Sequence, residues 1–342
     1  MRLVPFMLAV IALLPLSAGA QSEGLVEVVE IRGIIDAPVE RTVLGAIAEA
    51  GRDDADVLLV QIDSRGSLGA DRARRIVDAI GATDVPVVAW IGPPGSVAEN
   101  ATAAIALAAD VVAMAPGTAL GPVTSAGLTE RIDPGPLGED LPDRALSADA
   151  AERAGLVDLL ALNVPELLDA LEDLDVEGAE IRFRRLGVWG QALHATAQPS
   201  IAYLLLLVGL AGIMFEAFHP STGPAGITAA LGLALSGYGL WTLSASPLGV
   251  ILLVAAVVFL SIDLRFAGLG LFSALGTVAL VAGSLLLFRG PFLHVHPGAL
   301  ATGIVGMLTF NFGAMTRVLR DLRAIARGEL EVTDAHPHPE EA

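Results

Sequence analysis

Five long apolar segments follow residue 198, and they constrain the fold of this chain more than any other feature of its sequence. They span approximately residues 201–218, 224–243, 248–262, 270–288 and 297–315. Each is near the length that a helix needs to cross the hydrocarbon layer of a bilayer, and the third is the shortest. Because a helix satisfies its own backbone hydrogen bonds in lipid, we expect residues 201–315 to form an all-α, polytopic membrane bundle of about five helices.

The charged residues lie mostly outside these apolar segments. Residues 21–198 hold 30 acidic residues and 13 arginines, whereas residues 199–316 hold only two of each. An acidic soluble domain therefore precedes a nearly uncharged domain whose partner is the lipid bilayer. Nucleic acid is not expected as a partner, because phosphate contacts need clustered basic residues.

The N-terminus has the pattern of a secretory signal peptide. Arg2 supplies a positive charge, residues 6–16 are apolar, and Ala18-Gly19-Ala20 is a small-residue cleavage site. Residues 1–20 are therefore predicted to be a cleaved signal peptide, and an uncleaved anchor helix is the alternative. In both cases the domain that follows leaves the cytoplasm.

An odd number of spans places the two ends of the membrane domain on opposite sides. Residues 316–342 then form a cytoplasmic, partly disordered tail whose arginines, beginning with Arg317, agree with the positive-inside rule. The chain is thus predicted to be a multi-pass protein of the cell membrane with an extracytoplasmic N-terminal domain. Trp189, Tyr203 and Trp241 lie near the predicted interfaces, where amphipathic rings are stable.

The exported domain alternates short apolar runs with amphipathic segments. Strands are predicted at 26–31, 57–62, 87–91 and 111–114, and helices at 38–50, 68–80, 97–108, 148–155 and 165–174. Residues 63–67, reading DSRGS, are predicted to form a turn after the second strand. This β-α order predicts an α/β domain with parallel strands and right-handed crossovers.

Several long strings in this chain resemble one family. They read VLLVQIDSRGS, VPVVAWIGPPGSVAENATAAIALAADVVAMAPGTALG, LSADAAERAGLVDLL and PSIAYLLLLVGLAGIMFEAFHP. They look like the NfeD family of membrane-bound serine proteases, over roughly residues 24–315. The resemblance implies a ClpP/crotonase-like domain at 24–180, a juxtamembrane segment at 181–200 and a membrane domain at 201–315. The tail is too short for the C-terminal OB-type barrel that many long members carry.

The catalytic residues of that family do not carry over. The family uses a serine nucleophile and a lysine base, and an ungapped alignment on residues 115–118 places the serine position on Asn100. Thr102 replaces a family glycine, and the chain contains no lysine. Arginine stays protonated at neutral pH and cannot replace the base. The resemblance therefore implies no intact catalytic pair. Ser96 is predicted to cap the helix that follows, and the alternative is a nucleophile with Glu99 as its base.

The turn that forms the oxyanion hole in the family corresponds to Gly66 and Ser67. Their backbone N–H groups could still bind a peptide carbonyl, so the resemblance implies a peptide groove there. The alternative is a plain turn between a strand and a helix.

Other polar residues give no sign of a metal or cofactor site. The chain has no cysteine, and His294 and His296 alone are too few ligands for a metal. Glu216, His219 and Asp263 lie near predicted helix ends, where they would meet headgroups or water; an ion path is the alternative. We therefore expect no cofactor and no metal.

Three functions remain open at the level of sequence. The first is a pseudoprotease or scaffold in membrane protein quality control or organisation. The resemblance implies a stomatin- or flotillin-like membrane protein as its partner, and a homo-oligomer is a further expectation. The alternatives are an active membrane-bound serine peptidase that uses Ser96, and a small transporter or channel.

Overall fold

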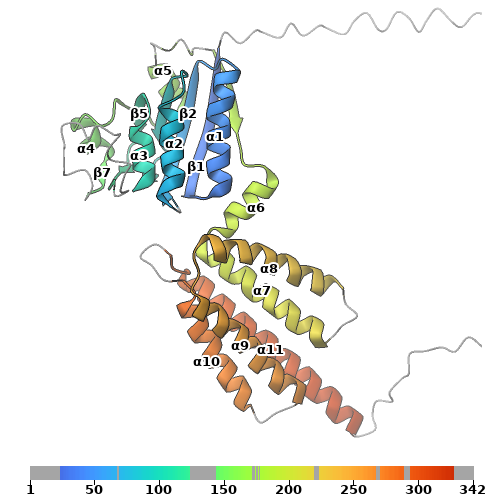
Figure 1. Ribbon diagram of the computed structural model, residues 1–342. Coiled ribbons are helices and arrows are strands. Elements are labelled where there is room, and N and C mark those ends of the chain that lie inside the picture. Colours follow the sequence, from blue (N-terminus) through green and yellow to red (C-terminus); the bar gives the residue numbers. More distant parts are fainter. Residues whose placement is uncertain are drawn as a thin grey trace, which may run out of the picture. The chain divides into compact units, whose positions relative to one another are not determined.

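The computed structural model describes residues 24–67, 69–123, 144–171, 174, 176, 178–218, 223–266, 270–288 and 293–326. Contacts divide the chain into two compact units (Figure 1). The α/β unit comprises the residues up to Gly33, Thr42–Gly66 and Ala73–Arg185, and the helical unit comprises Ile34–Arg41, Ser67–Arg72 and the residues from Leu186. The prediction of an α/β domain followed by a helical region is confirmed. The signal peptide and the tail after Ala326 lie outside the described residues.

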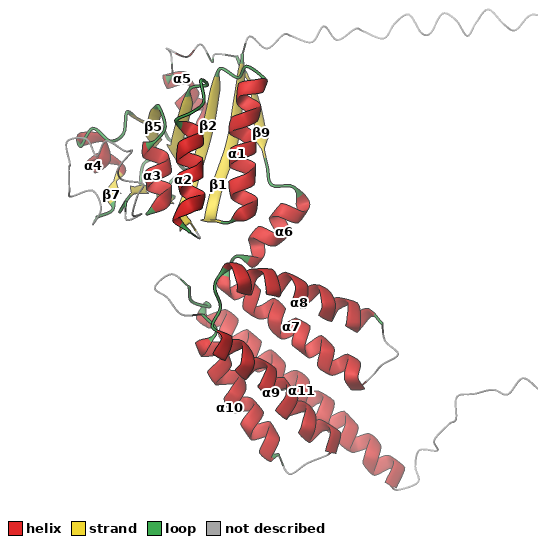
Figure 2. Cartoon of the chain, viewed as in Figure 1, coloured by secondary structure: helices red, strands yellow, loops and turns green. Residues whose placement is uncertain are grey.

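The α/β unit follows the predicted alternation of strands and helices. The elements that lie wholly or mostly in it are β1 (Leu25–Ile35), α1 (Ala37–Arg52), β2 (Val57–Ser67), α2 (Ala70–Ile80), β3 (Val87–Ile91), β4 (Val97–Ala98), α3 (Ala101–Leu107), β5 (Val111–Met114), β6 (Ala119–Leu120), β7 (Leu146–Ser147), α4 (Ala148–Arg153), β8 (Leu159–Leu160), α5 (Val164–Ala170) and β9 (Glu180–Arg184). Figure 2 shows α1, α2 and α3 in front of the strands.

The strands form one nine-stranded sheet in the order β7-β6-β4-β2-β3-β5-β8, and β1 pairs with both β2 and β9. β6 and β7 pair antiparallel, whereas the pairs β1–β9, β2–β3, β2–β4, β3–β5, β4–β6 and β5–β8 are parallel. β2 changes partner along its length, because Leu58–Ile62 pair with β3 whereas Ser64 pairs with Ala98 of β4. Every residue of β3 is buried, as expected for a parallel strand covered on both faces.

One core cluster fills the side of the sheet against α5. It includes Val26, Leu59, Val88, Trp90 and Leu167, all almost fully buried. The indole N–H of Trp90 donates to the carbonyl of Ala161 at 3.0 Å, so the polar end of this ring is satisfied inside the core.

The structure corrects two local predictions. The DSRGS segment is not a turn, because β2 continues through Ser67. The predicted helix 97–108 is wrong at its start: Val97 and Ala98 form β4, and α3 begins at Ala101. Both errors have one cause, since β4 pairs with the end of β2 and with β6, and such non-local pairing overrides local propensity.

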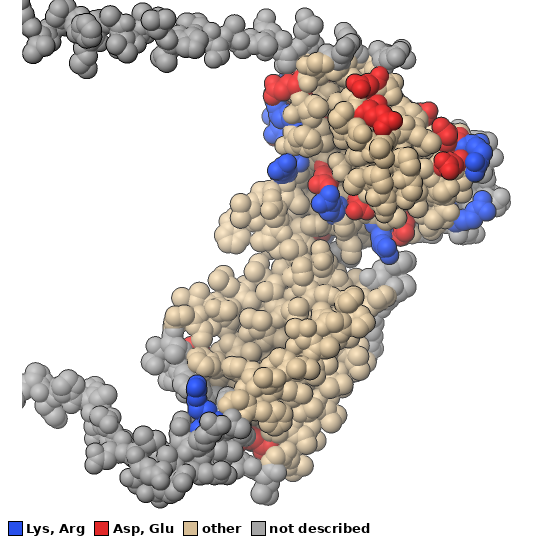
Figure 3. Space-filling view, turned by 180° about the vertical axis from the view of Figure 1, so that it is seen from behind, with Lys and Arg blue, Asp and Glu red and all other residues tan. Residues whose placement is uncertain are grey.

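The helical unit holds α6 (Val188–Thr196), α7 (Pro199–Phe218), α8 (Pro224–Thr242), α9 (Pro247–Phe266), α10 (Leu271–Leu286) and α11 (Pro297–Ala326). Each of the five apolar segments is therefore a helix. Within the described residues, α7 and α9 are long and apolar enough to cross a membrane, and α10 is a shorter apolar helix. In the view of Figure 3 the surface of this unit is almost free of charged side chains.

Glycines allow close packing of neighbouring helices in this unit. A Cβ at Gly212 in α7 would lie 2.8 Å from the Cβ of Ala229 in α8, and one at Gly249 in α9 would lie 2.5 Å from the Cα of Leu287. Small residues at such positions let helix backbones approach each other. Tyr203 does not lie at an exposed interface as predicted; it is fully buried, and its hydroxyl is 2.9 Å from that of Ser284.

Candidate functional site

A sharp turn between β4 and α3 places Asn100 at its apex. Asn100 has φ 54° and ψ −120°, and the N–H of Thr102 donates to the carbonyl of Glu99 at 3.1 Å. These values describe a type II′ turn with Asn100 at its first central position, where glycine is preferred. A side chain at such an angle costs about 1–3 kcal/mol, and strain of this kind is concentrated at functional sites.

The end of β2 lies against this turn. The N–H of Glu99 donates to the carbonyl of Ser64 at 3.0 Å, and the side-chain amide of Asn100 donates to the carbonyl of Arg65, also at 3.0 Å. A Cβ at Gly66 would lie 3.5 Å from the Cβ of Asn100. The structure therefore brings together Asn100 and Gly66, two positions that the sequence assigned to one site.

Gly66 and Ser67 have different surroundings. Gly66 has φ +140°, a backbone conformation that favours glycine, and its N–H donates to the hydroxyl of Ser64 at 3.3 Å, which is a long bond. The hydroxyl of Ser67 donates to the carbonyl of Gly69 at 2.9 Å. Gly66 is buried, and its N–H is thus held by one long hydrogen bond inside the protein.

Thr102 ties the first turn of α3 to β2. It is fully buried, and its hydroxyl lies 2.8 Å from the carbonyl of Ser64 and 2.7 Å from that of Glu99. A threonine therefore fits where the resembled family has glycine, because its one polar atom finds acceptors on both sides of the turn.

The apex residue Asn100 carries neither a hydroxyl nor a thiol. An amide such as that of Asn100 is not a nucleophile, and the chain contains no lysine, no cysteine and no histidine before His194. What remains is a strained turn with hydrogen-bond donors. Backbone donors of this kind can hydrogen-bond a carbonyl oxygen.

Ser96 does not occupy the apex and does not cap α3. It precedes β4, is 4% exposed, and its carbonyl accepts the N–H of Ala119 at 3.2 Å. The prediction that Ser96 is the helix cap is therefore wrong, because Asn100 holds that position. A nucleophile at Ser96 would therefore precede β4, whereas Asn100 lies after β4, at the N-terminus of α3.

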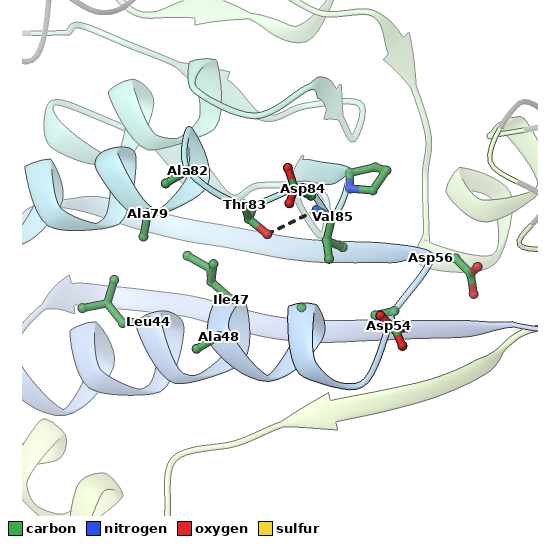
Figure 4. A pocket seen from close by; sticks show the side chains of 13 residues that line it. Leu44, Ile47, Ala48, Asp54, Asp56, Ala79, Ala82, Thr83, Asp84 and Val85 are labelled. Atoms are coloured by element: carbon green, nitrogen blue, oxygen red, sulfur yellow. Dashed lines mark hydrogen bonds between the residues drawn. The ribbon is translucent and has the colours of Figure 1, made fainter.

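A hollow of about 680 Å³ lies between α1 and α2, near the residues that precede β2 (Figure 4). Its apolar lining includes Leu44 and Ile47, and its acidic lining consists of Asp54, Asp56 and Asp84. It adjoins the start of β2, whereas Asn100 lies beside the end of that strand. The hollow and the turn at Asn100 are therefore separate features.

Within the described residues no group of three or more His, Cys, Asp or Glu side chains could hold a metal ion. Asp263 has a structural contact: it is 1% exposed and accepts the N–H of Ser273 at 2.6 Å, in the first turn of α10. His296 accepts the N–H of Gly298 at 3.1 Å. His219 and residues 124–143 lie outside the described residues.

Comparison with known proteins gives matches to both parts of the chain. Residues 200–318 match the family model of the NfeD integral membrane domain. The membrane-bound protease PH1510 of Pyrococcus horikoshii is 23% identical over 325 residues, which cover 83% of this chain and 74% of that protein. The membrane protein NfeD1b of Bacillus subtilis is 27% identical over 326 residues, covering 82% and 72%.

Solved structures also resemble the chain. The 1510-N membrane protease specific for a stomatin homolog from Pyrococcus horikoshii is 23% identical, with a TM-score of 0.44, and covers 51% of this chain and 98% of that one. A complex of 1510-N with a substrate peptide is 22% identical, with a TM-score of 0.43 and coverage of 49% and 95%. ClpP1 from Listeria monocytogenes is 19% identical, with a TM-score of 0.33 and coverage of 41% and 94%.

Proposed function

We propose that this chain, which belongs to the NfeD family of membrane proteins, is a non-cleaving relative of a membrane-bound protease. In this proposal the α/β unit binds an extended segment of a partner protein beside the end of β2 and does not hydrolyse it. The chain thus acts as a pseudoprotease or scaffold at the membrane.

The observation that carries this proposal is the state of the apex residue. Asn100 keeps the strained type II′ geometry, yet its amide is hydrogen-bonded to the carbonyl of Arg65 at 3.0 Å. No hydroxyl or thiol stands at that position, and no lysine exists anywhere in the chain to act as a base. Two separate requirements of the Ser–Lys mechanism are absent, whereas the backbone of the turn is kept.

The backbone around the turn supports binding of an extended segment. Gly66 is buried beside the exposed Arg65, has no side chain, and donates its N–H only through a long hydrogen bond of 3.3 Å. A partner segment that lies along this strand end would gain main-chain hydrogen bonds, the usual source of affinity when a peptide is added beside a strand.

The proposed placement is a five-span membrane protein with the α/β unit outside the cytoplasm, after removal of residues 1–20. Five apolar helices and the arginines that follow them, Arg317 and Arg320 among them, support this topology. We propose a stomatin-like membrane protein as the partner, because the solved 1510-N protease is described as specific for a stomatin homolog.

A serine-directed fluorophosphonate probe tests the absence of catalysis. The full-length protein, Asn100→Ser and its matched control Asn100→Ala are purified in detergent and treated with the probe. We expect no labelling of any of the three, because a hydroxyl at the apex without a base remains a weak nucleophile. Labelling of the unmodified protein that disappears in Ser96→Ala would overturn the proposal.

Crosslinking in the native membrane, followed by capture of the tagged full chain, tests the binding half. The expected result is reproducible recovery of a stomatin-like protein from the unmodified chain. Recovery of no such protein in repeated captures would contradict the proposed partner.

A further inference from the structure

The three tryptophans of this chain have very different surroundings. Trp90 is 3% exposed in the core of the α/β unit, whereas Trp189 is 76% exposed and Trp241 is 87% exposed, both in the helical unit. Beside Trp189, Val188 is 81% exposed. Large apolar side chains with this exposure indicate a contact surface for a protein or a membrane. The indole ring is apolar with one polar N–H, so it is stable where an apolar region meets water.

Trp189 and Trp241 lie toward the same end of the helical unit. Trp241 is in the last turn of α8, and two residues earlier a Cβ at Gly239 would lie 2.4 Å from the carbonyl oxygen of Thr196 and 2.9 Å from the Cβ of Ala202. The end of α8 therefore packs at the junction between α6 and α7. Trp189 is in the first turn of α6, the short helix that leads into this junction.

Helix α6 has a protein-facing side and an exposed side. Nδ1 of His194 lies 3.2 Å from Oδ2 of Asp36, and a Cβ at Gly190 would lie 3.3 Å from Cδ2 of Leu186. Residues 190 and 194 are four apart and so share one face of the helix. Val188 and Trp189 point away from that face, and their exposure is consistent with this.

The surroundings of this exposed pair favour lipid as its occupant. Residues 186–198 contain no Asp, Glu or Arg, and the match to the NfeD membrane domain begins at residue 200, directly after α6 and the start of α7. The apolar surface of α6 is therefore continuous along the chain with a membrane domain. Tryptophan is the residue type that concentrates at the boundary between hydrocarbon and headgroups.

We propose that α6 is an interfacial helix whose Val188 and Trp189 insert into the lipid headgroup region, at the level marked by Trp241. This inference rests on the proposed function in one respect, the crossing of the bilayer by the helices from α7 onward. Trp189 lies at the end of α6 that is away from α7. A nine-residue helix is about 13 Å long, whereas one headgroup region is about 6 Å thick. Trp189 can therefore stay within the headgroup region only if α6 is inclined to the bilayer normal. Figure 1 agrees, because α6 runs at an angle to α7 and does not continue it.

Tryptophan fluorescence in bilayers with brominated acyl chains tests this placement. Four full-length proteins are reconstituted into phosphatidylcholine vesicles: the unmodified chain, Trp189→Phe, Trp241→Phe and the double variant. The double variant keeps only the buried Trp90 and supplies the background. Bromine is placed either near the carbonyl end of the chains or near their middle.

The expected result is a loss of fluorescence from both Trp189 and Trp241, beyond that of the double variant, and a greater loss with bromine near the carbonyl end. Quenching of Trp241 without quenching of Trp189 would overturn the interfacial role of α6 and leave the membrane topology standing. Quenching of neither ring would overturn the bilayer crossing on which both depend. If a protein partner covers Val188 and Trp189, Trp189 will be unquenched and blue-shifted only when that partner is present, which also overturns the proposal.

Discussion

Replacement of Asn100 by glycine should leave the α/β unit more stable than replacement by alanine. Both variants lose the hydrogen bond from the Asn100 amide to the carbonyl of Arg65, which is worth about 0.5–1.5 kcal/mol. They differ in backbone strain, because φ 54° and ψ −120° cost a residue with a Cβ about 1–3 kcal/mol and cost glycine little. Glycine loses about 0.4–1 kcal/mol of this advantage through its greater freedom in the unfolded chain. With central values of about 2 kcal/mol for the strain and about 0.7 kcal/mol for the unfolded-chain entropy, the glycine variant should be more stable by about 1.3 kcal/mol.

Urea unfolding followed by Trp90 emission measures this difference. The full-length protein carries Trp189→Phe and Trp241→Phe, so that only the buried indole of the α/β unit reports. At a urea dependence of about 2 kcal/mol/M, the midpoint of Asn100→Gly should lie about 0.5–1 M above that of Asn100→Ala. Equal midpoints, or a higher midpoint for alanine, would refute the type II′ geometry on which the candidate site rests.

The remaining predictions concern packing and charge. Gly239→Ala should disrupt the packing of α8, since the added Cβ would lie 2.4 Å from a backbone oxygen. Gly237→Ala is the control, because its added Cβ would have nothing within 4 Å. In detergent, Gly239→Ala should aggregate at a lower temperature than Gly237→Ala. Glu27→Gln should destabilise the α/β unit by about 1–3 kcal/mol in urea, less than for a fully buried pair because the partner arginines are about one third exposed. The hydrogen bond from Arg184 to Glu27 and the nearby carboxylates raise the pKa of the Arg184 guanidinium, while burial opposes this. Its stabilisation is therefore fully present below the ordinary arginine pKa and is lost only as the pH rises through the raised pKa, so Arg184→Gln should lower the urea midpoint equally at neutral and moderately alkaline pH. Thr102→Val should cost about 1–3 kcal/mol in the same assay, because it leaves the carbonyl of Ser64 with one donor fewer.

Long periodic elements could be predicted from the sequence because their signals are local. The buried strands 87–91 and 111–114 have the predicted bounds, and each of the five apolar segments is a helix. The first four helices lie within about four residues of their predicted ends, whereas α11 continues to Ala326, beyond the predicted end at residue 315. The resemblance to the NfeD family, inferred from strings such as ALAADVVAMAPGT, is confirmed in that residues 200–318 match the NfeD integral membrane domain and two relatives of the chain are membrane proteins of that kind.

Short elements could not be predicted, because long-range pairing creates them. β4, β6, β7 and β8 have two residues each, and none carries a pattern of its own. β9 has exposed apolar residues on one side and arginines on the other; Arg182 and Arg184 reach Glu27 on β1, a contact that only the folded sheet reveals. Alignment to the resembled family gave the position of Asn100, but its backbone angles could not be read from asparagine, which is not the residue that a type II′ turn prefers.

The most direct test of the central claim is whether the chain binds a partner without cutting it. The full-length protein in liposomes is incubated with the proposed partner, a stomatin-like protein of the same membrane. Complex formation and the intact mass of that protein are measured together, with the related membrane-bound protease as a positive control. The account predicts a complex in which the partner keeps its full mass over the period in which the protease cleaves it. Fragments that accumulate with the unmodified chain, or the absence of any complex, would contradict it.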